Sequence, residues 1–115
     1  MVDDDDSIRT ALRRLLETAG FSVETFGSAE SFLESPAADH TDCLVLDLRL
    51  EGASGLELQQ ELLAAERHVP TVFISSHRDT GSKQAAMHAG AIDFLYKPVD
   101  ADILLDAIQR ALEDM

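Results

Sequence analysis

The chain has 115 residues, of which 45% are hydrophobic and 27% charged, so it is long enough for one compact domain and too short for two. Its 22 acidic and 9 basic side chains give a formal net charge of -13, which excludes direct binding to nucleic acid or to anionic lipid headgroups. No apolar run approaches the roughly 18 residues that a membrane span needs, and the acidic N-terminus is unlike a signal peptide, so we expect a cytoplasmic protein with no membrane contact.

The first half of the chain predicts two helices and two strands. Apolar residues at helical spacing predict a helix over residues 7–19, capped by Ser7. Alternating apolar and polar residues predict a half-buried strand over residues 21–26. Ser28 is expected to cap a short helix that ends before Pro36. Residues 43–46 are apolar throughout and predict a strand covered on both faces.

The second half continues the alternation of helices and strands. A helix is predicted from near Ser54, a strand over residues 69–74, a helix over 82–89, a strand over 92–96, and a last helix that opens at the cap Asp100. Such alternation predicts a doubly wound α/β fold with a parallel sheet. In such folds, functional residues gather at the carboxyl ends of the strands.

Five polar residues stand at or next to predicted strand ends: Asp3, Asp4, Asp47, Ser75 and Lys97. Singly, each has an ordinary explanation as an acidic helix start, a turn residue or a strand terminus. Together at one sheet edge they predict a site. Neighbouring carboxylates repel each other unless a cation neutralises them, and hard oxygen ligands suit Mg²⁺. A carboxylate can attack phosphorus, so Asp47 is the predicted nucleophile, with Lys97 and Ser75 contacting phosphoryl oxygens.

Having these residues, the chain resembles the response-regulator receiver family, which has the CheY-like (flavodoxin-like) fold. The resemblance implies one receiver domain over residues 1–115 and a five-stranded parallel sheet in the order 2-1-3-4-5. Residues 47–50 and 76–79 are most similar to the FixJ-type branch, whose members often carry a DNA-binding domain after the receiver. The motifs that carry the resemblance are Val2-Asp3-Asp4, Leu44-Val45-Leu46-Asp47-Leu48-Arg49, Ser54-Gly55, Phe73-Ile74-Ser75-Ser76, Ala89-Gly90-Ala91-Ile92-Asp93-Phe94 and Lys97-Pro98.

For the acidic residues, the resemblance implies a phosphorylation site and its metal. Asp47 would accept a phosphoryl group from a sensor histidine kinase. Asp4 would bind Mg²⁺ directly and Asp3 mainly through water. The backbone carbonyl of Arg49 would complete the protein ligands.

For the other matching residues, the resemblance implies a switch. Ser75 would move to the phosphoryl group and Phe94 would rotate inward behind it, which changes the surface of the fourth helix, fifth strand and fifth helix. Lys97 would pair with the phosphate, and the peptide bond before Pro98 would be cis.

Three positions depart from the family pattern. Glu51 replaces a common proline, so the loop after Asp47 is expected to be less rigid. Gln84 replaces an aliphatic residue on the fourth helix, so any homodimer is expected to be weak or to depend on phosphorylation. Only Met1 and Val2 precede the acidic pair, so the first strand is expected to be shortened, and we expect a native segment upstream of it.

Two other readings remain open. One is a pseudo-receiver that binds partners without being phosphorylated. The other is an aspartate-nucleophile phosphohydrolase, which is disfavoured because such enzymes place the nucleophile on the first strand and the acidic pair last. Cys43 is expected to be a buried core thiol, and the four histidines (His40, His68, His77 and His88) are expected to be exposed and not to form a zinc site.

Overall fold

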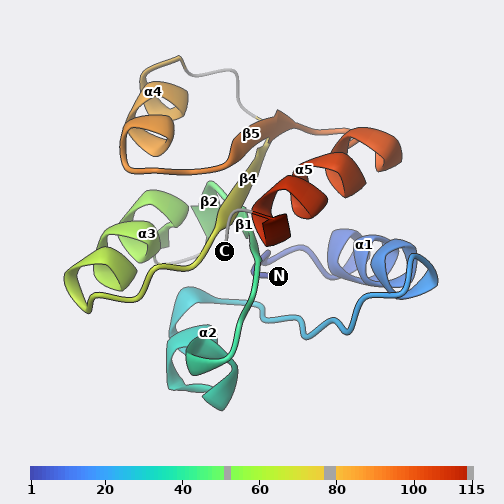
Figure 1. Ribbon diagram of the computed structural model, residues 1–115, viewed down its shortest axis with the longest axis horizontal. Coiled ribbons are helices and arrows are strands. Elements are labelled where there is room, and N and C mark those ends of the chain that lie inside the picture. The colour runs from blue at the N-terminus through green and yellow to red at the C-terminus, as the bar shows by residue number, and fades with distance from the viewer. Residues whose placement is uncertain (51–52, 77–79, 114–115) are drawn as a thin grey trace.

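The computed structural model describes residues 1–50, 53–76 and 80–113, in which helices and strands alternate as the sequence predicts (Figure 1). The helices are α1 (Asp6–Thr18), α2 (Ala29–Glu34), α3 (Gly55–Ala64), α4 (Thr80–His88) and α5 (Ala101–Glu113), with a 3-10 turn, η1, over Pro36–Asp39. The strands are β1 (Leu44–Asp47), β2 (Arg49–Leu50), β3 (Ala53–Ser54), β4 (Thr71–Ser75) and β5 (Asp93–Tyr96).

The strands β1, β4 and β5 form a parallel sheet in that order. Every residue of β1 and β4 is buried, which explains their unbroken runs of mostly apolar residues. Val2 extends the sheet because it forms parallel bridges to Leu46 on one side and to Phe26 on the other. The order through Phe26, Val2, β1, β4 and β5 is the predicted 2-1-3-4-5, with the first strand represented by Val2 and its two bridges.

The predicted strand over residues 21–26 is wrong in extent, because only Phe26 pairs with a neighbouring strand. Phe26 donates its N–H to the Met1 carbonyl at 2.9 Å, and Asp3 donates to the Phe26 carbonyl at 3.1 Å. A parallel ladder is built from hydrogen bonds to a neighbouring segment, and the bonds that Met1 and Asp3 make to this segment centre on Phe26. The antiparallel pair of β2 and β3 was not predicted, since two-residue strands carry no periodic signal.

Helices cover both faces of the sheet (Figure 1). On one face, α1 and α5 pack against the sheet through an apolar cluster that includes Leu12, Leu16, Val45, Ile74, Leu104 and Ile108. On the other face, α2, α3 and α4 pack through a cluster that includes Phe32, Leu46, Leu58, Leu62, Phe73 and Ala86. Successive strand residues point to opposite faces, so each strand contributes to both clusters.

The helix starts agree with the predicted caps except in α1. Asp5, and not Ser7, caps α1, because its Oδ1 accepts hydrogen bonds from the N–H groups of Ser7 at 2.9 Å and Ile8 at 3.2 Å. Aspartate caps as well as serine does, and Asp5 is the last extended residue after the bridge at Val2. Ser28 and Asp100 cap their helices as predicted, and α3, predicted to start near Ser54, is capped by that residue. Within the described residues, no helix has the length and apolar character needed to cross a bilayer.

Candidate functional site

Three carboxylates meet at the carboxyl edge of the sheet. One oxygen from each of Asp3, Asp4 and Asp47 lies within 4.8 Å of the others. Asp47 ends β1, and its N–H donates to the Val2 carbonyl at 2.9 Å, which brings Asp3 and Asp4 beside it. Asp3 and Asp47 are buried, whereas Asp4 is exposed. The acids predicted from the sequence therefore lie together in a group that opens to solvent at Asp4.

Lys97 joins the two buried carboxylates. Its Nζ lies 3.1 Å from Asp3 Oδ2 and 3.1 Å from Asp47 Oδ2. Its backbone N–H donates to the Ser75 carbonyl at 2.7 Å, and the peptide bond to Pro98 is cis, as predicted. Burial alone would lower the pKa of Lys97, but its hydrogen bond to Asp47 and its close contact with the Asp3 carboxylate outweigh burial and raise that pKa. The cation is therefore held between the acids.

Burial and neighbouring groups shift the pKa of the Asp47 carboxyl group in opposite directions. Burial is the largest of these and raises the pKa of its carboxyl group, and the nearby charge of Asp3 adds to the rise. The hydrogen bond from Lys97 and the N–H of Arg49, 3.2 Å from Oδ1, act in the opposite direction. The net direction is upward, so the ionised carboxylate is less stable here than in water.

The donor set fits a hard divalent cation. Asp3 Oδ2 is buried and makes the ion pair with Lys97, but it accepts no hydrogen bond with good geometry. A buried carboxylate is costly without enough positive charge beside it, and the single charge of Lys97 is shared between Asp3 and Asp47, so a divalent cation would complete the neutralisation. Asp3, Asp4 and Asp47 would hold Mg²⁺, with water on the open side. The predicted contribution of the Arg49 carbonyl, at the start of β2, stays a prediction.

Ser75 and Phe94 lie on the neighbouring strands. Ser75 ends β4 and is 1% exposed. Phe94 is 3% exposed, and its ring stacks on Phe73 with 5.8 Å between centroids and 23° between planes. Tyr96 packs edge-on against Phe94 at 5.6 Å. The Phe94 ring is already buried inside the domain. Its inward rotation stays a prediction, and any such rotation would start from a buried ring.

Two contacts at the site were not anticipated from the sequence. A Cβ on Gly55 would overlap the carbonyl oxygen of Asp47 and lie 3.1 Å from Leu48 Cα, so a glycine is needed where α3 begins against β1. The Arg9 guanidinium donates to the Asp3 carbonyl and pairs with Asp6. No spacing rule links Arg9 to Asp3, whereas the Ser54-Gly55 pair at a helix start was the available signal for Gly55.

A family model described as the response regulator receiver domain matches residues 1–109. The chain belongs to this family. Nodulation protein W of Bradyrhizobium diazoefficiens is 46% identical over 113 residues, which are 98% of this chain and 50% of that protein. The transcriptional regulatory protein FixJ of Azorhizobium caulinodans is 38% identical over 112 residues, which are 97% of this chain and 53% of that protein.

Solved receiver structures agree with this assignment. The response regulator StyR has a TM-score of 0.90 and 51% identity, covering 97% of this receiver and 57% of that chain. The structure of FixJ-N has a TM-score of 0.88 and 37% identity, covering 99% of this receiver and 91% of that chain. The receiver spans about half the length of the curated relatives named above.

The remaining sequence predictions have mixed outcomes. His40, His68 and His88 are exposed, as predicted, and none belongs to a metal-binding cluster among the described residues. The prediction that Cys43 is buried is wrong, because the thiol is only partly buried and borders an open cleft. Glu51 and residues 77–79 lie outside the described residues.

Proposed function

We propose that residues 1–115 act as the phosphoacceptor module of a two-component system, in which a sensor histidine kinase phosphorylates Asp47. The observation that carries the proposal is the Asp47 carboxylate beside two further acids, with Lys97 in contact with it. One oxygen of Asp47 attacks the phosphorus of a phosphohistidine. The new O–P bond forms as the N–P bond breaks, and the departing imidazole nitrogen keeps the electron pair and takes up a proton.

The surrounding residues make this transfer electrostatically feasible. Mg²⁺, when held by Asp3, Asp4 and Asp47, neutralises the negative charge that the incoming phosphoryl group adds. Burial disfavours the ionised form of Asp47, and the hydrogen bond from Lys97 offsets this effect. The same ammonium, which contacts the Asp3 carboxylate, can move to a phosphoryl oxygen. The Ser75 hydroxyl donates to another phosphoryl oxygen.

The output of the domain would pass through Ser75, which ends β4, the strand that lies between β1 with Asp47 and β5 with Phe94. The movement of Ser75 toward the phosphoryl group changes the packing behind it, and the surface of α4, β5 and α5 shifts between two populations. Because relatives such as FixJ are transcriptional regulatory proteins and are about twice as long, we include a C-terminal DNA-binding effector and a cytoplasmic location in the proposal. A weak or phosphorylation-dependent homodimer fits the same scheme.

The proposal is tested with a small phosphodonor. Acetyl phosphate or phosphoramidate with Mg²⁺ should add one phosphoryl group to the wild-type protein and none to Asp47→Asn. Asp42→Asn removes an exposed acid away from the cluster and should be labelled like wild type. An unlabelled wild type would favour a pseudo-receiver, and full labelling of Asp47→Asn would show that another group is the acceptor.

A further inference from the structure

Gln59 on α3 is a polar side chain at a position that helical spacing assigns to an apolar one. It stands three residues before the buried Leu62 and is itself 5% exposed. Among the residues that the structure describes, Gln59 is the only polar helix side chain that is buried. A buried amide of this kind needs hydrogen-bond partners inside the protein.

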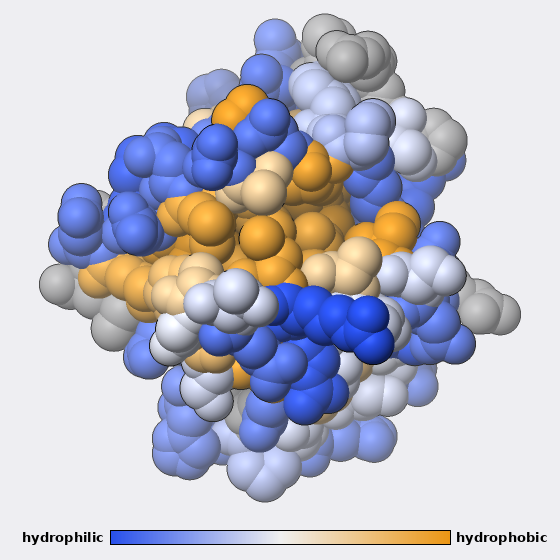
Figure 2. Space-filling model, turned by 90° about the vertical axis from the view of Figure 1, so that its right-hand side faces the viewer, coloured by the Kyte–Doolittle hydropathy of each residue, from blue (hydrophilic) through white to orange (hydrophobic). Residues whose placement is uncertain are grey.

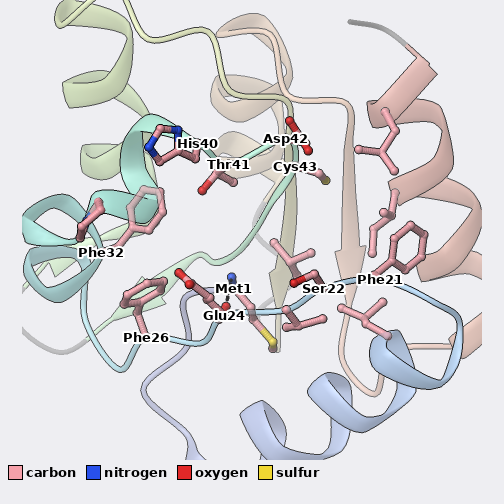
Figure 3. Close-up of a pocket in the computed structure, with 16 residues that line it drawn as sticks. Met1, Phe21, Ser22, Glu24, Phe26, Phe32, His40, Thr41, Asp42 and Cys43 are labelled. Atoms are coloured by element: carbon pink, nitrogen blue, oxygen red, sulfur yellow. Dashed lines mark hydrogen bonds between the residues drawn. The ribbon is translucent and has the colours of Figure 1, made fainter.

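Polar side chains reach water in another apolar part of the molecule. Apolar residues gather in a hollow on the side where α1 and α5 lie (Figure 2). The cleft drawn in Figure 3 is bordered by the polar side chains of Glu24, His40 and Asp42, and all three are exposed. Water can solvate these groups, whereas the amide of Gln59 depends on the protein around it.

The partner of the Gln59 amide is the end of α4, which lies beside α3 (Figure 1). Gln59 Nε2 donates to the Ala86 carbonyl at 3.2 Å. The same carbonyl accepts the N–H of Ala91 at 3.1 Å, and the Met87 carbonyl accepts the N–H of Gly90 at 3.0 Å. With Gly90 at a φ of +101°, this pair of bonds is a pattern that ends helices. Gln59 therefore binds a carbonyl that takes part in closing α4.

Most of α4 is exposed. Ala86 is the only buried side chain over residues 81–88. Nearer the start of the helix, the Lys83 ammonium lies over the Tyr96 ring, 5.9 Å from its centroid. Tyr96 in turn packs edge-on against Phe94, the residue predicted to switch. The helix is thus attached to α3 at its C-terminal end and contacts the switch region of β5 ahead of that end.

Stability does not account for a glutamine at position 59. Gln59 Oε1 is buried and accepts no hydrogen bond from the described residues. The Ala86 carbonyl would keep its bond from the Ala91 N–H if the amide were absent. A buried amide that is half satisfied stabilises a core no better than an apolar side chain of similar size. The amide adds a fixed position for the end of α4, because a hydrogen bond is directional and apolar packing is not.

We propose that Gln59 is a positioning residue that anchors the C-terminal end of α4 to α3, so that α4 swings about this end when the domain switches. The anchor is a property of the unphosphorylated protein. The swing rests on the proposed function, in which phosphorylation of Asp47 moves Phe94 and hence the contact between α4 and β5.

The anchor is tested with Gln59→Met, which removes the amide and keeps a side chain of similar length. Gln60→Met makes the same change on the exposed side of α3 and is the matched control. Amide exchange at Gly90 and Ala91 and unfolding in urea are measured without a phosphodonor. Gln59→Met should speed exchange at both amides by about fivefold or more, as for the loss of one hydrogen bond, with an unfolding midpoint equal to or above that of wild type. Gln60→Met should change neither quantity.

Two results would overturn the anchor. One is wild-type exchange at Gly90 and Ala91 in Gln59→Met, or an equal increase in Gln60→Met. The other is faster exchange in Gln59→Met with a matching fall in the free energy of unfolding, because that would show a general loss of packing and no positioning role.

The swing is tested by adding beryllofluoride, a stable mimic of the phosphoryl group, with Mg²⁺. In the wild type, exchange should change at Gln84 and Ala85, ahead of the anchor. It should stay constant at Gly90 and Ala91, whereas in Gln59→Met it should change at all four amides. Equal changes on both sides of the anchor in the wild type would overturn the swing. If beryllofluoride altered no amide in either protein while Gln59→Met still loosened the end of α4, the proposed phosphorylation would fail and the anchor would stand.

Discussion

The α-amino group of Met1 should make the stability of the domain depend on pH between 6 and 8. Burial lowers the pKa of this group from 8.0 to about 6, against smaller opposing effects of Cys43 and Glu24. Above pH 8 the group is neutral in the folded and the unfolded chain. Between the two pKa values the unfolded chain binds more protons, so stability rises with pH across this window. Below pH 6 both states are charged and the full cost of burying the charge is present.

The magnitude follows from the size of the shift. A difference of about two pKa units, at about 1.4 kcal/mol each, corresponds to about 3 kcal/mol of stability lost when the pH falls from above 8 to below 6. This is a large part of the roughly 5 to 15 kcal/mol that holds a typical domain folded. The loss is therefore large enough to measure by urea unfolding.

The assay compares the free α-amine with an Nα-acetylated form of the same protein, and intact mass confirms that Met1 is present in both. Every other titrating group is shared, so the difference between the two unfolding free energies isolates the α-amino group. The unfolding free energy of the acetylated form should increasingly exceed that of the free-amine form as the pH falls from 8 to 6. A difference that is constant over this range, or that grows as the pH rises, refutes the reasoning.

Three further predictions concern the acidic site. Gly55→Ala forces a methyl group against the Asp47 carbonyl and should cost about 1 to 3 kcal/mol in urea unfolding; unchanged stability would show that the contact is not restrictive. Lys97→Met leaves the Asp3 and Asp47 carboxylates together without their cation, so it should destabilise the protein by about 1 to 3 kcal/mol at neutral pH and less in acid, and equal losses at both pH values would contradict this. Asp4→Asn should weaken Mg²⁺ binding by about tenfold or more in calorimetric titration while changing metal-free stability by less than about 0.5 kcal/mol, because the side chain is exposed; equal Mg²⁺ titrations would remove Asp4 from the ligand set.

The sheet and the site were predictable because their signals are local. The run from Leu44 to Leu46 is apolar at every position, as a strand buried on both faces requires, and Asp47 follows it directly. Parallel strands bring their carboxyl ends to one edge, so the meeting of Asp47 with Asp3 and Lys97 follows from the fold class.

The remaining features depend on contacts that no local period encodes. The alternation over residues 21–26 is typical of a strand, but the bridge to Val2 is made at Phe26, and pairing between distant segments has no local signal. The four consecutive acids, residues 3–6, are equally good capping residues. Asp5 is the cap because it is the last residue with extended backbone after the bridge at Val2. The fit of Gly55 against Asp47 is visible only once α3 and β1 are side by side.

The most direct test of the central claim is to identify the residue that carries the phosphoryl group. After reaction with acetyl phosphate and Mg²⁺, borohydride reduces an aspartyl phosphate to homoserine, and peptide mass spectrometry locates the altered residue. We expect homoserine at position 47 alone, dependent on both the donor and Mg²⁺. Homoserine at Asp3 or Asp4, or an unaltered Asp47 in a protein that has taken up phosphate, would contradict it.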